Sequence, residues 1–352
     1  MHSQEFVPGE DADTSVGQAS AVRSGRGRLL LIAKVLVTIL LCTIIVWHAN
    51  WGRMLQGLRE ANGFLVAVVF FSMVLCVTIS TYKWQLLLRI HGARFPFGHL
   101  HRLYFTSMFL NNFLPTSIGG DGYRIYRTLK NQRSKTVAFL AVFMERLIGI
   151  ASLLMIGFFA ALIGYSTGAN ALSRMTIIVG VVGIAIGTPF LLLAFNRRFV
   201  SWLTSLRKFP DLLRNIVDYL GDYRREPART WRVILVSFGF HFFTVWWLML
   251  LIDATGGSIA YYEVAVVCAV LSVVAVIPLS INGLGLVDGA FIYLVGFYGV
   301  HYEVALMTAL LQRALMVPIS LAGGLIYLFD ERRSRARGEE ESTQDAALRS
   351  RR

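Results

Sequence analysis

Two polar stretches with several glycines interrupt a chain that is otherwise strongly apolar. The first reads NNFLPTSIGGDGYRIYRT over residues 111–128, and the second reads PLSINGLGLVDG over residues 278–289. Proline lacks a backbone donor and glycine tolerates positive φ, so each stretch is expected to end a helix and turn the backbone with some polar groups unpaired. Amides freed at the start of the next helix attract anions. These stretches therefore favour anion binding.

Arg124 and Arg127 stand about one helical turn apart, directly after the glycines of the first stretch. Two guanidinium groups and the amides before them form a suitable grip for a phosphate. A second interpretation stays open, in which both arginines face the membrane headgroups and fix the orientation of the chain.

The composition decides the setting of this chemistry. Of 352 residues, 55% are hydrophobic and only 16% are charged, whereas a soluble domain carries about 25% charged residues. Apolar runs of roughly 18 to 25 residues, long enough to cross the hydrocarbon core, recur along the chain. The sequence thus predicts an all-α polytopic membrane protein of the cytoplasmic membrane, where the natural phosphate is that of a lipid.

The formal charge of +13 would suggest nucleic acid in a soluble protein. Here the lysines and arginines stand between apolar runs, as the positive-inside rule and attraction to anionic headgroups require. We therefore expect membrane lipids as partners and no nucleic acid. The three cysteines, Cys42, Cys76 and Cys268, lie inside apolar runs and predict no disulfide framework.

About eight or nine membrane segments are expected. They cover residues 29–48, 63–82, 97–114, 137–165, 176–195, 232–252, 261–278, 286–299 and 303–328. Basic residues flank the short segment 97–114 on both sides, so it is expected to enter the membrane and return as a broken, re-entrant element. The pair 261–278 and 286–299 is expected to make a second such excursion. Residues 1–28 and 330–352 are expected to be disordered and cytoplasmic.

The two polar stretches belong to a longer internal repeat, with halves at about 63–165 and 230–328. Setting PTSIGGDG against PLSINGLG pairs Pro115 with Pro278, and a slightly larger offset pairs Arg146 with Arg313. The positive-inside rule gives the two halves opposite orientations. Inverted repeats are common in transporters, in which paired interrupted segments meet near the midplane of the bilayer and form the substrate site. The alternative, that proline and glycine only kink two helices, stays open.

Polar residues inside the apolar runs complete the candidate site. Ionisable side chains there are costly unless they face a cavity or each other. Glu145 and Arg146 are adjacent and point to different sides of a helix, so each needs a partner elsewhere. Ion pairs between the copies, such as Asp121 with Arg146 or Asp288 with Arg313, are an alternative to ligand contacts. The candidate lipid-binding residues are Asn111, Asn112, Pro115, Ser117, Gly119, Gly120, Asp121, Gly122, Arg124, Arg127, Glu145, Arg146, Ser280, Asn282, Gly283, Gly285, Asp288, Gln312 and Arg313.

The motifs of known soluble enzymes do not occur. There is no nucleophile elbow, P-loop or zincin helix. A dinucleotide-binding fingerprint would follow a predicted strand, and SIGGDG follows none. His99, His101 and His241 have no carboxylate or cysteine at ligand spacing. We therefore expect no catalytic residue, no metal and no cofactor, although a lipid-linked transferase working with a few charged residues stays open.

The stretches NNFLPTSIGGDGYRIY and PLSINGLGLVDGAFIY, with MERLIG between them, resemble the transmembrane domain of the lysylphosphatidylglycerol synthase family of flippase-like membrane proteins. The resemblance covers roughly residues 30–330 and implies a flippase-like domain over 29–329 that moves a lipid between leaflets. The chain has no room for the soluble synthase domain, so aminoacyl transfer is not implied. One departure is that Val287 and Asp288 stand where the family pattern suggests an Arg-Glu pair.

The sequence thus favours a membrane protein that binds and flips an anionic or phosphate-bearing lipid, either a phospholipid or an isoprenoid-phosphate lipid. Two alternatives stay open. One is a membrane-embedded transferase in aminoacyl-, glycosyl-isoprenoid- or hopanoid-lipid synthesis. The other is an accessory subunit that supports lipid-biosynthesis enzymes. The oligomeric state is left open.

Overall fold

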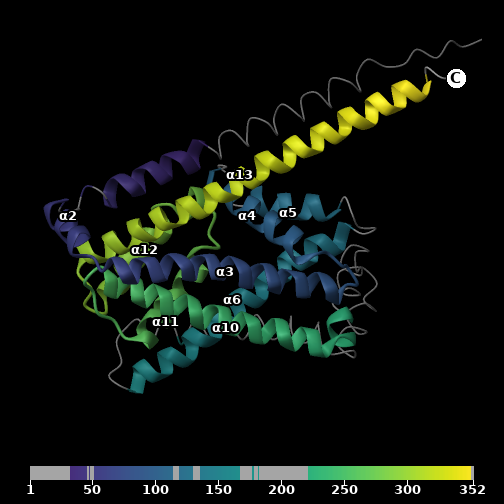
Figure 1. The fold of residues 1–352 in the computed structure, drawn as a ribbon. Helices are drawn as coiled ribbons and strands as arrows, with labels where there is room; N and C mark the ends of the chain where they lie inside the picture. Colours follow the sequence, from purple (N-terminus) through teal and green to yellow (C-terminus); the bar gives the residue numbers. More distant parts are fainter. Residues whose placement is uncertain are drawn as a thin grey trace, which may run out of the picture.

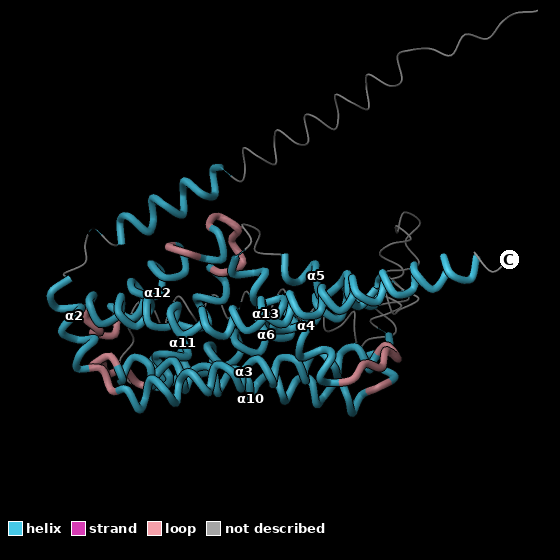
Figure 2. The backbone as a smooth tube through the Cα atoms, turned by 45° about the horizontal axis from the view of Figure 1, so that its top comes forward, coloured by secondary structure: helices cyan, strands magenta, loops and turns pink. Residues whose placement is uncertain are grey.

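A computed structural model describes residues 32–45, 47, 51–113, 119–129, 135–166, 177, 181 and 221–349, without the side chains of 331–349. This part of the chain is helical and contains no strand (Figures 1 and 2). The protein is therefore an all-α membrane protein, as predicted. Predictions for the N-terminal segment 1–28 and most of the candidate span 176–195 lie outside the described residues.

The helices form two series of four, preceded by the apolar helix Ile32–Ile45 and by α2 (Trp51–Glu60). The first series is α3 (Gly63–Ile90), α4 (Phe97–Phe113), α5 (Gly119–Leu129) and α6 (Lys135–Ser166). The second is α10 (Pro227–Ala254), α11 (Tyr261–Val274), α12 (Leu286–Gly296) and α13 (Tyr302–Arg349), with the short 3-10 turn Ile281–Gly283 before α12. We call these series copy 1 and copy 2.

The helix lengths repeat from copy to copy. Helices α3 and α10 both contain 28 residues, and α5 and α12 both contain 11. In each copy a short helix pair, α4–α5 or α11–α12, stands between two long helices. The interruptions predicted from the polar stretches are thus present at matching places in both copies.

Helices α3 and α10 pack side by side in opposite directions. At one end, the Asn62 amide before α3 donates to the carbonyl of Ala254, the last residue of α10, at 3.0 Å. At the other end, His91 after α3 contacts the Asp222 carboxylate at 3.1 Å, shortly before α10 begins. Equivalent helices therefore cross any membrane in opposite senses, which is the geometry of an inverted repeat.

The two copies interlock. Helix α6 of copy 1 packs on α11 of copy 2, and α13 of copy 2 packs on α4 of copy 1. Small residues allow both crossings, since a Cβ on Gly157 would lie 2.2 Å from the Ala269 Cβ and one on Gly323 would lie 2.0 Å from the Phe105 carbonyl oxygen. Glycine at helix crossings is the usual device for close packing in membranes. Neither copy completes its core without the other.

Four of the described helices are long and apolar enough to span a membrane: 63–90, 136–166, 227–254 and 302–330. The helices Ile32–Ile45 and Tyr261–Val274 and the segment Ile281–Gly296 are apolar but shorter. The predicted segments 29–48, 63–82, 137–165, 232–252, 261–278, 286–299 and 303–328 overlap these helices, whereas segment 97–114 corresponds to α4, which is not among them. Two further differences concern helix ends.

Helix α3 extends beyond the predicted end at residue 82 to Ile90, and Lys83, which follows that predicted end, is buried inside the protein. Helix α13 extends to Arg349 through the tail that the sequence analysis predicts to be disordered. Alanine, glutamate and arginine, which have high helix propensity, are frequent there and favour continuation of the helix.

Candidate functional site

The two interrupted segments meet. Asn112, at the end of α4, accepts a hydrogen bond from the Asn282 amide of the 3-10 turn in copy 2. The Asn112 amide in turn donates to the Ser320 hydroxyl of α13. The side chain of Asn111 accepts a hydrogen bond from the Gly120 amide at 2.9 Å, at the start of α5. The prediction that the polar residues of both stretches mark the junction between the copies is confirmed for Asn112 and Asn282.

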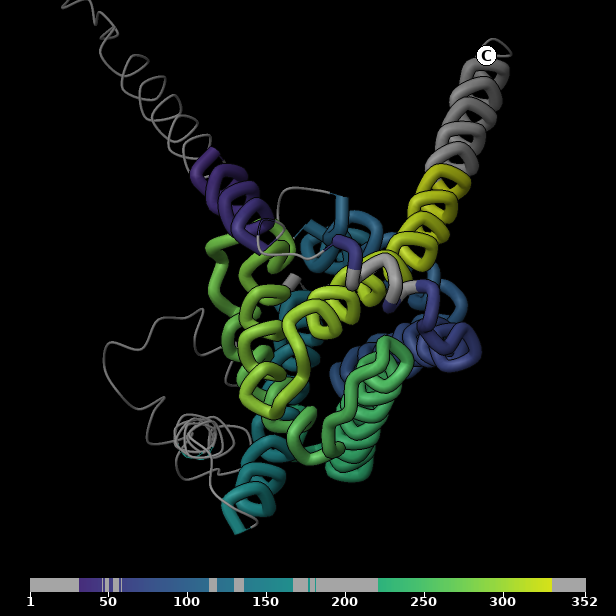
Figure 3. Tube along the Cα trace, turned by 90° about the vertical axis from the view of Figure 1, so that its left-hand side faces the viewer, coloured from purple at the N-terminus to yellow at the C-terminus, as the bar shows by residue number. Residues whose placement is uncertain are grey.

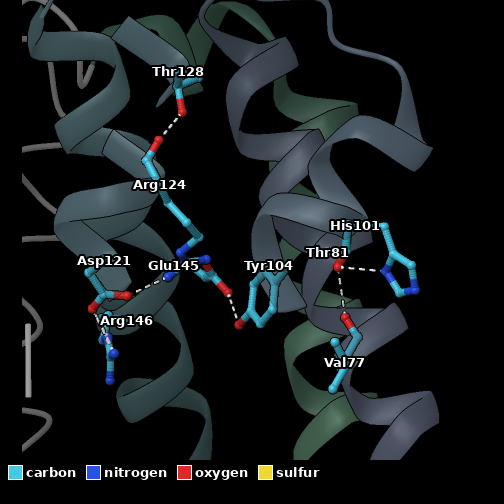
Figure 4. A network of polar contacts seen from close by, with 9 residues as sticks. All are labelled: Val77, Thr81, His101, Tyr104, Asp121, Arg124, Thr128, Glu145 and Arg146. Atoms are coloured by element: carbon cyan, nitrogen blue, oxygen red, sulfur yellow. Dashed lines mark hydrogen bonds and ion pairs between the residues drawn. The ribbon is translucent and has the colours of Figure 1, made fainter. Parts of the chain in front are cut away.

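A network of charged side chains lies beside this junction in copy 1 (Figure 4). Arg124 of α5 donates to Asp121 at 2.7 Å and to Glu145 of α6 at 2.8 Å. Tyr104 of α4 donates to the other oxygen of Glu145 at 2.9 Å. Arg146 donates to Asp121 at 3.0 and 2.6 Å through its Nε and Nη2 atoms. Three helices are thereby joined through four balanced charges.

Arg124 is the buried centre of this network. Its side chain is only 3% exposed, and its guanidinium lies 4.5 Å from the ring centre of Tyr104 and 5.1 Å from that of Trp84. Two carboxylates and two aromatic faces compensate the loss of hydration. The guanidinium of Arg124 is thus occupied within the protein.

Arg127 lies apart from this network. Its guanidinium is 5.8 Å from the ring centre of Tyr123. Arg124 and Arg127 therefore face different partners, and the structure does not bring them together as a single phosphate grip. Arg146 is different again, because its side chain is 57% exposed although it pairs with Asp121.

Copy 2 contains a matching ion pair. Arg313 of α13 donates to Asp288 of α12 at 3.0 and 3.1 Å, and its Nη1 atom lies 3.4 Å from the carbonyl oxygen of Asn282. The side chain of Arg313 is 32% exposed. The ion pairs Asp121–Arg146 and Asp288–Arg313 are thus both confirmed, but each forms within a copy and not between copies.

The positions around these pairs differ. Arg124 is the sixth residue of α5, and the sixth residue of α12 is the buried Phe291. Glu145 precedes Arg146, whereas the half-buried Gln312 precedes Arg313. Copy 2 therefore keeps the outer, partly exposed ion pair and replaces the inner, buried one with an apolar and a neutral side chain.

The motif glycines serve different purposes in the two copies. Gly283 and Gly285 have φ of 71° and 76°, in the left-handed region that glycine tolerates, and they turn the chain before α12 as predicted. Gly120 lies inside α5, where a Cβ would be 2.0 Å from the Ser107 carbonyl oxygen of α4. In copy 1 the glycine is required for a close helix crossing.

The remaining predicted residues have varied surroundings. Gly119 begins α5, and Gly122 is exposed on it. Ser280 is buried, and its hydroxyl has no hydrogen-bond partner in the described part of the chain. Pro115 and Ser117 lie outside the described residues. Whether any of the predicted residues contacts lipid stays a prediction.

Sequence reasoning missed three side chains of the site. Trp84 and Tyr104 flank Arg124, and Lys83 is 4% exposed and interacts electrostatically with Glu145, Arg124 and Arg146. The predicted segment 63–82 ends directly before Lys83, which leaves this residue outside the candidate site. The signal that could have corrected this is the apolar sequence WQLLL after it, which continues the helix.

No group of three histidine, cysteine, aspartate or glutamate side chains in the described residues is arranged to hold a metal ion. The charged groups of the network are paired with each other. The arrangement is therefore suited to holding arginine guanidinium groups in place near the junction of the copies.

Comparison with known proteins identifies the family. The family described as "Lysylphosphatidylglycerol synthase TM region" matches residues 31–323. The chain belongs to this family. The chain is also similar to a UPF0104 membrane protein of Methanothermobacter thermautotrophicus and to one of Methanocaldococcus jannaschii. The first is 21% identical over 298 residues, covering 78% of this chain and 85% of the relative. The second is 22% identical over 280 residues, covering 73% and 82%.

This match confirms the resemblance seen in the two polar stretches. Together with the four long apolar helices, it establishes a multi-pass membrane protein of the synthase transmembrane-region family. The name of the family refers to a membrane lipid, which places the protein in the context of lipid-related membrane functions.

Proposed function

We propose that this protein binds an anionic, phosphate-bearing lipid at the junction of its two copies and moves it across the cytoplasmic membrane. The observation that carries the proposal is the pair of equivalent, partly exposed arginines, Arg146 of copy 1 and Arg313 of copy 2, whose copies meet at the Asn112–Asn282 contact. In inverted-repeat transporters the substrate site lies at the contact between such repeats.

The hydrogen-bond pattern of these arginines suits a phosphate. Arg146 uses Nε and Nη2 for Asp121, and Arg313 uses the same two atoms for Asp288. Neither ion pair uses Nη1, and Nη1 of Arg313 makes only a long contact of 3.4 Å to the Asn282 carbonyl oxygen. A phosphate oxygen that binds at Nη1 would therefore leave both ion pairs intact. Guanidinium groups bind phosphate through several parallel donors. The inner Arg124 holds helices α4, α5 and α6 in place.

Movement follows from the contact between the copies. The junction at Asn112 and Asn282 consists of neutral hydrogen bonds, each worth about 0.5–1.5 kcal/mol net. This local contact opens and closes at low cost, whereas the ion pairs within each copy and the packing of α6 on α11 and of α13 on α4 persist. Separation of the copies at this contact would expose Arg146 and Arg313 to opposite leaflets in turn, with both chain termini on the cytoplasmic side.

The experiment uses the full chain in vesicles that contain a fluorescent phosphatidylglycerol, with leaflet exchange followed by chemical quenching of the outer leaflet. We expect exchange above that of protein-free vesicles. Arg146→Gln and Arg313→Gln should each lower the rate by about tenfold, which corresponds to one lost charge-assisted contact.

The matched control is Arg225→Gln, which removes another arginine from an ion pair, between Arg225 and Asp222, away from the junction. It should exchange lipid like the wild type. Equal rates for all three variants, or no exchange of anionic lipid by the wild type, would refute the proposal. A lipid that is chemically altered during the assay would instead indicate a transferase.

A further inference from the structure

An apolar groove lies between the first helix and α12, separate from the charged network of copy 1. Its volume is about 630 Å³, and residues of helix Ile32–Ile45 form one wall while α12 and the residues up to Tyr302 form the other. Figure 3 shows the first helix, in purple, beside the green helices of copy 2. The lining includes Leu41, Ile45, Gly289, Ile292 and Phe297.

The first helix is fixed along this groove at three points. The Thr38 hydroxyl accepts a hydrogen bond from the Ile281 amide at 3.0 Å. The Tyr302 hydroxyl donates to the carbonyl oxygen of Ile45 at 2.7 Å. Between these points, a Cβ on Gly285 would lie 2.6 Å from the Cβ of Leu41. The helix thus touches α12 closely at Gly285.

The walls separate towards the other end of α12. A Cβ on Gly289 would make ordinary contact with Ile45 at 3.5 Å, and a Cβ on Gly296 would meet no atom within 4 Å. Because both residues line the groove, its space widens from Gly285 towards Gly296. This shape is long, apolar and closed at the end near the 3-10 turn.

A cation stands at the narrow end. Gly285 donates its amide to Asp288 at 3.0 Å, and Asp288 holds Arg313. The position of a Cβ on Gly283 lies 3.9 Å from Nη2 of Arg313. The groove is therefore apolar along its length, and the partly exposed Arg313 guanidinium, paired with Asp288, lies near its closed end. An apolar groove with a guanidinium near one end is complementary to an anionic amphiphile.

We infer that this groove binds one hydrocarbon chain of an anionic membrane lipid, with the lipid phosphate beside Arg313. The inference rests on the proposed function and adds to it the place of the chain. Dry apolar cavities bind apolar groups of matching shape, and each buried methylene contributes roughly a fourfold gain in affinity. The charged head supplies the selection for anionic lipid.

The test uses the full chain in nanodiscs with a phosphatidylglycerol that carries a photoreactive diazirine in the middle of one acyl chain. The crosslinked peptides are identified by mass spectrometry, and a phosphatidylcholine with the same chain serves as the comparison lipid. We expect labelling to concentrate on helix 32–45 and α12, and to be stronger for phosphatidylglycerol. Arg313→Gln should remove the preference for phosphatidylglycerol.

Gly296→Phe should fill the groove and displace at least two methylene groups, which lowers the labelling of these peptides by about tenfold. The control Gly239→Phe adds the same side chain to an exposed position of α10, where a Cβ also meets no atom within 4 Å; it should leave labelling unchanged. Gly296→Leu provides the same test with a smaller side chain if the phenylalanine variant does not fold.

Labelling spread evenly over all membrane-facing helices, or an equal effect of Gly296→Phe and Gly239→Phe, would overturn the inference. Because crosslinking measures occupancy without transport, the two proposals fail separately. Specific labelling without leaflet exchange would leave the groove in place and refute translocation. Leaflet exchange without specific labelling would support translocation and refute the binding of an acyl chain in the groove.

Discussion

The two copies of the repeat carry the same outer ion pair but different cores behind it. In copy 1, Asp121 and Arg146 stand in front of the buried pair Arg124–Glu145. In copy 2, Asp288 and Arg313 stand in front of Phe291 and Gln312. The shared feature is the partly exposed arginine, which argues that it serves the common task of both copies. The buried Arg124–Glu145 pair joins the helices of copy 1 through charges, whereas copy 2 has the uncharged Phe291 and Gln312 at the equivalent positions.

The largest expected effect concerns the buried pair of copy 1. Arg124→Phe leaves Glu145 without its cation and should lower the free energy of unfolding by about 3–5 kcal/mol, measured by denaturant unfolding in detergent micelles. The double variant Arg124→Phe/Glu145→Gln copies the residues of copy 2 and should recover at least about half of that loss, because the unpaired Glu145 carboxylate is removed as well. A double variant as unstable as the sum of its single changes would contradict this reading.

The next effect concerns the helix crossing that only copy 1 makes with a glycine inside its short helix. Gly120→Ala places a Cβ against the Ser107 carbonyl oxygen and should cost about 1–3 kcal/mol of unfolding free energy. The same substitution at the exposed Gly122 meets no atom within 4 Å and should stabilise α5 by up to about 1 kcal/mol. Equal melting temperatures for the two variants would show that the crossing is looser than described.

The third effect compares the two outer ion pairs directly. Asp121→Asn removes the carboxylate shared by Arg124 and Arg146 and should cost about 2–3 kcal/mol in the same unfolding assay. Asp288→Asn affects a single, partly exposed arginine and should cost about 1 kcal/mol or less. The reverse order would mean that copy 2, and not copy 1, contains the tighter charge network.

The smallest effect concerns the end of the α3–α10 pair, where His91 contacts Asp222. Burial lowers the pKa of His91, although its hydrogen bond to the Asp222 carboxylate opposes this shift. Since the unfolded chain then binds the proton more readily, stability is complete above about pH 6.5 and falls as the pH drops below that value. His91→Phe should reduce this fall in a pH series of melting temperatures, whereas an unchanged pH profile would exclude His91 as its source.

Much of the fold could be predicted from the sequence because membrane helices are recognised by the length and apolar composition of their segments. The two interruptions, the inverted order and the pairs Asp121–Arg146 and Asp288–Arg313 followed from the polar stretches and the repeat. The partner of Arg124 did not, since its contacts with Glu145 and Trp84 depend on how α3, α5 and α6 pack. The predicted segment 63–82 ends before Lys83, and only tertiary packing shows that this residue is buried.

The prediction that Arg124 and Arg127 act together on a phosphate rested on their spacing along one helix. Two residues three apart share a helix face, but the neighbours of that face decide what each one meets. Here Glu145 and Asp121 occupy Arg124, and Tyr123 covers Arg127. Arg146 and Arg313, the arginines that we propose for the phosphate, come from the two long helices that follow the interruptions.

The central claim is that the copies separate at the contact between Asn112 and Asn282 during lipid movement. The most direct test is a variant without the native cysteines that carries Asn112→Cys and Asn282→Cys, joined by a short, cleavable thiol crosslinker in proteoliposomes. We predict that the crosslinked protein exchanges anionic lipid no faster than protein-free vesicles and regains its rate when the crosslinker is cleaved. Lipid exchange by the crosslinked protein at the rate of the cleaved protein would contradict the account.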